Sequence, residues 1–263
     1  MRGGAQAHLL ECGDGHHYVV KFRNNPQHAR ILVNEWLASS LLAYLNISTP
    51  EIALVTLSSE FLAGAPDVYI QLRSKHLAVE PGQHFGSRRP GRPGKTLVYD
   101  FLPDTLLEKV VNQSEFLGAL LLDKWVGNAD ARQAIFRRSA QSSPNCADRP
   151  RGFLASMIDQ GCSFGGPDWK FYDSPLQGLY FQPVVYRNVR SVDDFQPWLD
   201  QVVGFPEGAL DEARASIPPE WIAGEEASLD ALLEKLRSRR SRVPDLVADS
   251  ARGRVNPFPR WGS

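Results

Sequence analysis

The sequence predicts an α+β fold, in which a small antiparallel sheet with one helix is followed by a mainly helical region. Three observations predict this order. Short β-rich runs bounded by turn residues occupy much of residues 7–72. One long apolar helical pattern, at residues 26–45, interrupts them. Another apolar helix at residues 115–126 and several amphipathic segments dominate the rest. The length of 263 residues fits one large domain or two lobes.

The regular structure begins with a predicted β-hairpin. Residues 7–11 form a short strand, Gly13-Asp14-Gly15 has turn chemistry, and residues 17–22 are rich in β-forming side chains. Two further strands are expected at residues 51–57 and 68–72. Together these strands predict a small antiparallel sheet in the first part of the chain.

The predicted helix at residues 26–45 carries a carboxylate on its apolar side. Asn25 suits the N-cap position and Pro26 the first helical position. Glu35 shares a sector of about 80° with apolar residues, at the helical period of about 100° per residue. Those apolar residues are Ile31, Ala38, Leu42 and Leu45.

A buried ionised carboxylate needs a cationic partner, or its pKa rises until the group is neutral. Lys21, at the end of the second strand, is the best candidate partner for Glu35. Two alternatives stay open. Glu35 can instead form a structural ion pair with Arg23 or Arg30, and Lys21 can be a solvated residue at a strand edge.

Residues 81–95 are rich in Gly, Pro and Arg, which predicts a mobile loop that contributes to substrate choice. Residues 91–96 look like the end of a P-loop, but we reject that motif. Its first glycine would fall at Arg89, and residues 97–99 favour a strand where the motif requires a helix. Ser87 is a candidate phosphorylation site beside a basic cluster. That cluster is either exposed to solvent or binds an anionic partner or a phosphate group on the protein itself. The cluster comprises Arg88, Arg89, Arg92 and Lys95.

The second half of the chain is predicted to start with a core helix. Ser114 is the expected N-cap of a helix at 115–126 that is apolar nearly all round. This helix leads into Gly127-Asn128-Ala129-Asp130. The remaining expected elements are strands at 134–137 and 153–158, separated by a polar insertion at 139–151, and helices near 192–203, 207–216 and 226–240.

Two aspartates in this half carry the predicted chemistry. Asp130 follows the apolar helix, and Asp159 follows the strand at 153–158. Together with a Lys21/Glu35 pair they match the needs of ATP-dependent phosphoryl transfer. The acids can hold magnesium and orient a hydroxyl, while the lysine stabilises the phosphates. The plainer interpretation is turn chemistry, because Asn-x-Asp and Asp-x-Gly sequences often cap local backbone.

The chain resembles the HipA-like kinases, bacterial relatives of the eukaryotic protein-kinase fold. The resemblance rests on short motifs that occur in the family's order over roughly residues 1–165. Arg2-Gly3-Gly4-Ala5-Gln6 resembles the phosphate loop, Val19-Val20-Lys21 the strand lysine, Glu35 the helix glutamate, Gly127-Asn128-Ala129-Asp130 the catalytic loop, and Ile158-Asp159-Gln160-Gly161 the metal-binding turn.

The resemblance implies a bilobal fold with a nucleotide-binding lobe at 1–100, a helical catalytic lobe at 101–250 and a tail at 251–263. It implies ATP and Mg²⁺ as cofactors, a hydroxyl acceptor on a protein Ser or Thr or on a small molecule, and a possible regulatory protein partner. The implied site comprises Asp130 as base, Lys21 and Glu35 as its catalytic partners, Gly3, Gly4, Ala5, Gln6 and Lys21 at the nucleotide, and Asp159 and Gln133 at the metal.

The catalytic loop departs from the family pattern at two positions. The family has a metal-binding Asn five residues after the catalytic Asp, where this chain has Ile135. Gln133 is the nearest polar substitute, since its carbonyl oxygen can bind a metal. Arg132 occupies a loop position where the family has histidine. The alternative function is therefore a catalytically weak pseudokinase that acts as a nucleotide-binding or protein-interaction module.

Composition excludes several other classes. The formal net charge of −1 gives no electrostatic case for direct binding to nucleic acid or membranes. The three cysteines lack Cys-x-x-Cys spacing, which argues against a disulfide framework and a structural zinc site. Without an apolar run of about 18 residues or a signal peptide, we expect a cytoplasmic protein. A hydrolase using Cys146 or Cys162 is a distant third function, because the six histidines lie in the first 84 residues.

Overall fold

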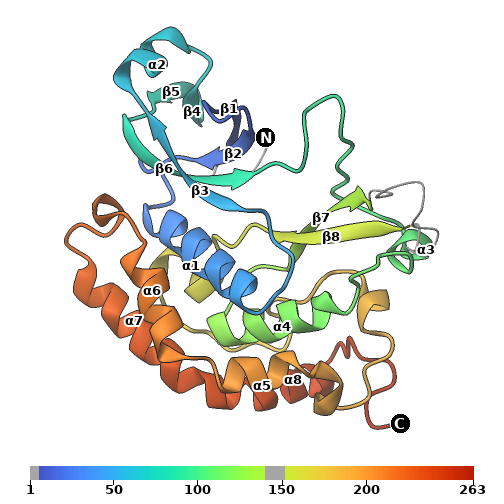
Figure 1. The fold of residues 1–263 in the computed structure, drawn as a ribbon. Helices are drawn as coiled ribbons and strands as arrows, with labels where there is room; N and C mark the ends of the chain where they lie inside the picture. The colour runs from blue at the N-terminus through green and yellow to red at the C-terminus, as the bar shows by residue number, and fades with distance from the viewer. Residues whose placement is uncertain (1–5, 140–151) are drawn as a thin grey trace.

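The computed structural model describes residues 6–139 and 152–263. Its first part is a four-stranded sheet in the order β1-β2-β6-β3, with every neighbouring pair antiparallel. The strands are β1 (His8–Glu11), β2 (His17–Lys21), β3 (Ile52–Leu57) and β6 (Gly82–Arg88). A helix, α1 (Arg30–Tyr44), lies between this sheet and the helical part, as Figure 1 shows. The short helix α2 (Ser59–Gly64) and the hairpin β4 (Tyr69–Leu72) and β5 (Lys75–Ala78) extend from the sheet.

The second part is mainly helical and carries a β-hairpin beneath the sheet (Figure 1). This hairpin pairs β7 (Gln133–Arg138) with β8 (Phe153–Ile158) in antiparallel register, from Gln133 opposite Ile158 to Arg138 opposite Phe153. The α-helices are α3 (Asp104–Leu107), α4 (Glu115–Val126), α5 (Trp198–Val203), α6 (Glu207–Ala215), α7 (Glu226–Arg239) and α8 (Val243–Arg252). The short 3₁₀ helices are η1 (Ser163–Asp168), η2 (Pro183–Tyr186), η3 (Val192–Phe195), η4 (Pro219–Trp221) and η5 (Arg240–Arg242). No helix within the described residues is long and apolar enough to cross a membrane.

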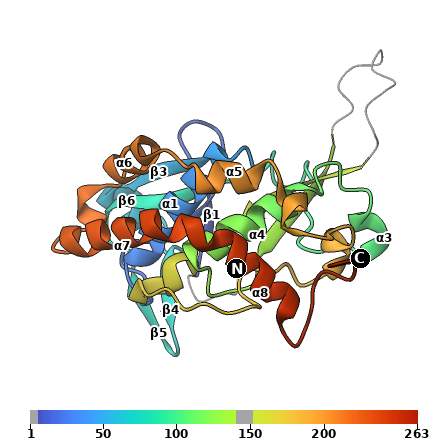
Figure 2. The same ribbon diagram turned by 90° about the horizontal axis from the view of Figure 1, so that it is seen from below.

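Two apolar cores correspond to these two parts. The smaller core includes Val20 and Phe22 with side chains from β3 and β4. The larger core extends from α1, which is buried nearly all round, through α4 to the C-terminal helices. Figure 2 shows α4 among the elements of the helical part, seen from below. The predicted α+β fold, with its small antiparallel sheet and a larger helical part, is confirmed.

The predicted start of the first helix is wrong by four residues. Asn25 does cap local backbone, but its Oδ1 accepts the Gln27 N–H at 2.8 Å within a turn. His28 then adopts φ 98°, which breaks the helical path. The helix α1 consequently begins at Arg30, after Ala29.

The mobile loop predicted at residues 81–95 is also partly wrong, because β6 occupies residues 82–88 in the interior of the sheet. Gly86 has a packing role there, since a Cβ would come within 2.5 Å of the Val55 side chain. Phe85 is fully buried in this strand. Ser87 pairs with Val19 and Ile52 and is half-buried, so it lies in the sheet and not on a loop.

Smaller differences occur further along the chain. The strand expected at residues 97–99 is reduced to one bridge between Tyr99 and Phe136. The segment 192–203 is divided into η3 and α5. Ser114 precedes α4 as expected, although its side chain makes no capping hydrogen bond. The tail at residues 251–263 packs on the protein, because Phe258 is fully buried.

Candidate active site

Lys21 and Glu35 form a buried ion pair between the sheet and α1. The Lys21 ammonium contacts Glu35 Oε1, and the two residues are only 9% and 3% exposed. Glu35 Oε2 accepts a second hydrogen bond, from the Gln160 N–H at 3.0 Å. The helix carboxylate therefore has both oxygens satisfied, as a buried charge requires. The competing pairings do not occur, since Arg30 pairs with Glu225 and Arg23 with Glu80.

Asp159 completes a three-residue cluster with this pair. Lys21 Nζ lies 2.7 Å from Asp159 Oδ1, although the two residues are 138 positions apart in the chain. Asp159 has φ 59°, a left-handed conformation at the end of β8. Gly161 lies tightly behind it, because a Cβ there would be 3.2 Å from Glu35 Oε1 and 3.0 Å from the Ile31 side chain. This close packing holds the Asp159 turn against α1.

The electrostatics favour the charged forms of Lys21 and Asp159 and oppose that of Glu35. Burial works to lower the pKa of Lys21, but the Glu35 and Asp159 carboxylates raise it above its ordinary value. Burial opposes the charge of Asp159, yet Lys21 holds the pKa of that carboxyl below its usual range. Burial raises the pKa of Glu35 above its ordinary value, and Lys21 counteracts this effect only in part. The result is an ammonium group held between the carboxyl groups of Glu35 and Asp159.

Gln133 lies at the same cluster. Its Nε2 donates to Asp159 Oδ2 at 3.2 Å, from the first residue of β7. Ile135, at the position where the family pattern has Asn, is a half-buried strand residue opposite Ser156. The structure therefore brings Gln133, and not residue 135, to the side chain of Asp159.

Asp130 lies in a well-defined turn after α4. Gly127 ends the helix in the left-handed conformation with φ 59°. Asn128 Oδ1 accepts the Asp130 N–H at 3.1 Å, and Asp130 Oδ1 accepts the Ala131 N–H at 2.7 Å. These bonds agree with the plainer turn interpretation of Asn-x-Asp, and they also fix the backbone that carries the carboxylate. Asp130 remains exposed, so a solvent-borne acceptor can reach it.

The sequence analysis did not predict a buried polar network that lies beneath the Asp130 loop. Asp123, on the otherwise apolar α4, receives two hydrogen bonds from the Arg132 guanidinium and one from Asn128 Nδ2 at 3.0 Å. Arg132 also donates to Gln160 Oε1 at 2.6 Å. This network ties the loop of Asp130 to the turn of Asp159. The available signal was Asp123 itself, a charged residue within an apolar helix.

The expected phosphate loop is only partly covered by the structure. Gly3, Gly4 and Ala5 lie outside the described residues. Gln6 is described, and its side chain makes two hydrogen bonds with the Gln71 backbone, at 2.6 and 2.5 Å. Gln6 therefore joins the segment directly before β1 to β4.

The donor set fits Mg²⁺ bound together with phosphates. No cluster of three or more His, Cys, Asp or Glu side chains suitable for a metal occurs among the described residues. Mg²⁺ does not require one, because it usually binds through one or two carboxylates, several waters and substrate phosphates. Asp159 suits this role, since its side chain is 43% exposed while one oxygen is held by Lys21.

The cysteine-based hydrolase finds no support in the described residues. Burial raises the pKa of the Cys162 thiol, which disfavours the nucleophilic thiolate. Cys146 lies outside the described residues.

The small antiparallel sheet, the lysine–glutamate pair and the two aspartate turns define a kinase-like phosphotransferase. Comparison with protein families agrees, since residues 1–145 match the family described as HipA-like kinase. The match spans more than half of the chain, and the protein belongs to this family. No curated protein matches the sequence.

Solved structures with a similar fold include the following two. The structure of hydra Fam20 with sugar has a TM-score of 0.54 and 17% sequence identity, and the match covers 95% of this chain and 82% of that chain. The structure of the Golgi casein kinase has a TM-score of 0.50 and 13% identity, with 97% and 72% of the two chains covered. At these identities the likeness concerns the fold alone.

Proposed function

We propose that this protein transfers the γ-phosphoryl group of ATP, with Mg²⁺, to a hydroxyl acceptor. A protein serine or threonine is the acceptor that we favour, because it is the one that the family resemblance implies. One observation carries the proposal. Lys21 contacts both the buried Glu35 and the partly exposed Asp159, whose second oxygen accepts from Gln133. A cation and a metal-binding carboxylate held side by side are what nucleotide phosphates require.

The proposed roles of the site residues in phosphoryl transfer follow from the surroundings of each side chain. Lys21 supplies positive charge for the phosphates, and Glu35 keeps its side chain extended toward them. Asp159 and Gln133 would hold Mg²⁺, which neutralises charge on phosphate oxygens when it is bound. Asp130 would accept a hydrogen bond from the acceptor hydroxyl and orient its oxygen toward the phosphorus.

This division suits the chemistry of phosphoryl transfer. Its transition state is loose and spreads charge over the equatorial oxygens, so positioning and charge compensation contribute most of the catalysis. Both are properties of a rigid site. The buried Asp123–Arg132–Gln160 network provides this rigidity, because it joins the Asp130 loop to the residue that follows Asp159.

The alternative function, a catalytically weak nucleotide-binding or interaction module, rests on Ile135. The contact between Gln133 and Asp159 favours the active enzyme, because a polar side chain accompanies the metal-binding carboxylate. A Gln133→Ala variant tests this point through the Mg²⁺ concentration that gives half-maximal turnover. We expect that concentration to rise, whereas an unchanged value would remove Gln133 from the metal site.

Turnover of ATP tests the proposed function directly. We expect Asp130→Ala and Asp159→Ala each to lower the rate of ATP hydrolysis or autophosphorylation by about 100-fold or more. Asp67→Ala is the matched control, since Asp67 is an exposed aspartate outside the site. Thermal unfolding of each variant checks that the fold is retained. Nucleotide binding without turnover in the wild-type protein would instead support the non-catalytic module.

A further inference from the structure

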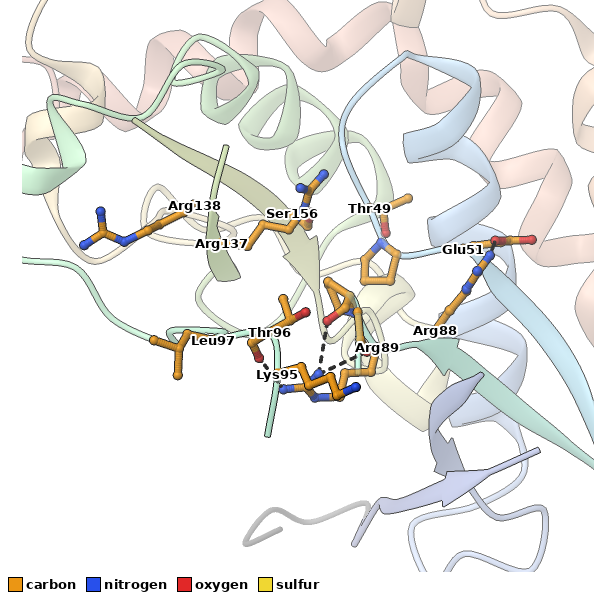
Figure 3. A pocket seen from close by; sticks show the side chains of 13 residues that line it. Thr49, Glu51, Arg88, Arg89, Lys95, Thr96, Leu97, Arg137, Arg138 and Ser156 are labelled. Atoms are coloured by element: carbon orange, nitrogen blue, oxygen red, sulfur yellow. Dashed lines mark hydrogen bonds and ion pairs between the residues drawn. The ribbon is translucent and has the colours of Figure 1, made fainter. Parts of the chain in front are cut away.

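A second candidate site lies away from the candidate active site. A cavity of about 690 Å³ is lined by residues 49–51 before β3, by Arg88 at the end of β6, by residues 89–91 and 95–97 after it, and by parts of β7 and β8. Figure 3 shows side chains from these segments around it. Lys21, Asp130 and Asp159 are not among the lining residues. The cavity is therefore distinct from the cluster described above.

The walls of this cavity are strongly cationic. Five basic side chains line it and only one carboxylate, Glu51, does so. This local excess contrasts with the formal net charge of −1 for the whole chain. The basic residues are Arg88, Arg89, Lys95, Arg137 and Arg138. Like charges gathered in one concave surface repel one another, so an anion that binds there relieves an unfavourable interaction.

Three of the five cations already have partners. Arg88 pairs with Glu51 at 2.5 Å, which neutralises the one acidic residue of the wall. Arg89 donates to the backbone oxygens of Gly91 and Thr96, at 3.1 and 2.9 Å, as the dashed lines in Figure 3 show. The guanidinium of Arg138 lies over the Phe153 ring.

Lys95 and Arg137 differ from these three. Neither side chain makes a hydrogen bond or an ion pair with any residue that the structure describes. They also come from different walls, Lys95 from the segment after β6 and Arg137 from β7 (Figure 3). A ligand with negative charge at more than one point can pair with both.

The Lys95 wall is a built turn. Gly91 has φ 65°, and a Cβ there would lie 2.1 Å from Thr96 Oγ1, so the chain closes tightly at this point. The Arg89 guanidinium then bridges the two ends of the turn. This arrangement fixes the backbone that carries Lys95, so less backbone conformational entropy is lost when a ligand binds.

We propose that this cavity binds a small ligand carrying two or more phosphate groups. The volume is that of a small-molecule site, which usually measures about 300–1,000 Å³. Guanidinium groups bind phosphate oxygens through paired, charge-assisted hydrogen bonds, and an ammonium binds them as a point charge. The site concerns a different surface from the proposed phosphoryl transfer and does not depend on it.

Binding of inorganic pyrophosphate to the full chain tests the proposal, measured by isothermal titration calorimetry with a chelator in place of Mg²⁺. The double variant Lys95→Gln/Arg137→Gln removes the two uncommitted charges and keeps polar side chains. We expect its dissociation constant to rise about 10-fold or more, because charge-assisted hydrogen bonds are lost. Orthophosphate should bind more weakly than pyrophosphate.

The double variant Lys235→Gln/Arg254→Gln is the matched control. It removes one lysine and one arginine that are exposed and lie outside the cavity. Its affinity should equal that of the wild type. Absence of pyrophosphate binding, an equal loss in both double variants, or tighter binding of a phosphoserine peptide than of pyrophosphate would overturn the proposal.

Competition identifies the source of the phosphates. ADP that displaces pyrophosphate from the wild-type protein, but not from Lys95→Gln/Arg137→Gln, supports the site and assigns a nucleotide to it. A lack of displacement, with pyrophosphate binding intact, supports the site with a polyphosphate that is not a nucleotide. Thermal unfolding of both double variants checks that the surface changes leave the fold intact.

Discussion

Buried charges organise the centre of this protein at the level of single residues. Glu35 is neutralised by Lys21 and accepts the Gln160 N–H, and Asp123 is neutralised by Arg132. Desolvation makes such pairs costly unless every polar atom is satisfied. They consequently contribute more to the positions of Asp130 and Asp159 than to net stability.

His84, on β6, is a buried group that responds to pH. Burial lowers its pKa to about 4. Its Nδ1 accepts the Arg23 N–H at 3.0 Å, and its Nε2 lies 3.0 Å from the Glu80 carbonyl oxygen. A neutral ring with its proton on Nε2 satisfies both partners. The folded protein therefore holds His84 in the uncharged form.

We expect this histidine to make stability fall in acid. Its folded pKa lies below the unfolded value of about 6.5, so the unfolded chain binds the proton more tightly. Stability that is present above pH 6.5 is lost as the pH falls toward 4, by up to about 3 kcal/mol. Urea unfolding at several pH values should show a smaller decrease for His84→Gln than for the wild type. His76→Gln, at an exposed position on β5, should keep the wild-type decrease.

At the scale of elements, α4 is fitted closely to α5. Gly118 faces Trp198, and a Cβ at Gly118 would lie 2.7 Å from the indole ring atoms. The absence of a side chain at this position allows the two helices to approach. A rigid indole cannot give way as a flexible side chain can, so the packing should be sensitive to one added methyl group.

Gly118→Ala should therefore lower the free energy of unfolding by about 1–3 kcal/mol. This loss would occur although alanine favours a helix interior by about 1 kcal/mol over glycine. Gly208→Ala in α6 is the matched substitution, because nothing lies within 4 Å of a Cβ there. That variant should gain stability, up to about 1 kcal/mol. Urea denaturation of both proteins checks the two opposite signs, and a gain in Gly118→Ala would contradict the packing argument.

The helix α1 is fixed in place by elements from the far end of the chain. Trp36 donates to Ser216 Oγ at 2.8 Å and meets the Trp221 ring edge-on at 6.0 Å. Arg30 donates to the Pro167 oxygen at 2.8 Å. These contacts hold Glu35 toward Lys21, so the ion pair depends on the helical part as well as on the sheet.

At the scale of the whole molecule, the C-terminal residues complete the larger core. Phe258 is fully buried and meets Tyr186, Phe195 and Trp261 at ring distances of 5.7, 5.8 and 5.3 Å. Trp221, in η4, donates to the Gln83 oxygen of β6 at 2.9 Å. The last part of the chain thus supports both the helical part and the sheet.

Phe258→Ala should lower the free energy of unfolding by about 3–5 kcal/mol, because it leaves a cavity among three aromatic rings. Val255→Ala, at a side chain that is 60% exposed, should change stability by less than about 0.5 kcal/mol. Thermal or chemical unfolding distinguishes the two. Equal stabilities for the two variants would show that the tail contributes nothing to the core.

The sequence by itself determined the fold class and most of the longer strands and helices apart from β6, and it favoured Lys21 over Arg23 and Arg30 as the partner of Glu35. These follow from local patterns, because periodicity records which side of an element is buried, and a carboxylate on an apolar side needs a cation. Local patterns also placed α4 and β8 at the residues where the structure has them.

Only the tertiary structure decided how Lys21 reaches Asp159, how Asp123 receives Arg132, and that β6 lies inside the sheet. Each depends on contacts between residues distant in the sequence. Gly86 illustrates the reason, since the need for a glycine there is evident only when Val55 of the neighbouring strand is known to pack against it. The same holds for the cationic cavity, because Lys95 and Arg137 line one cavity only once the segment after β6 lies beside β7.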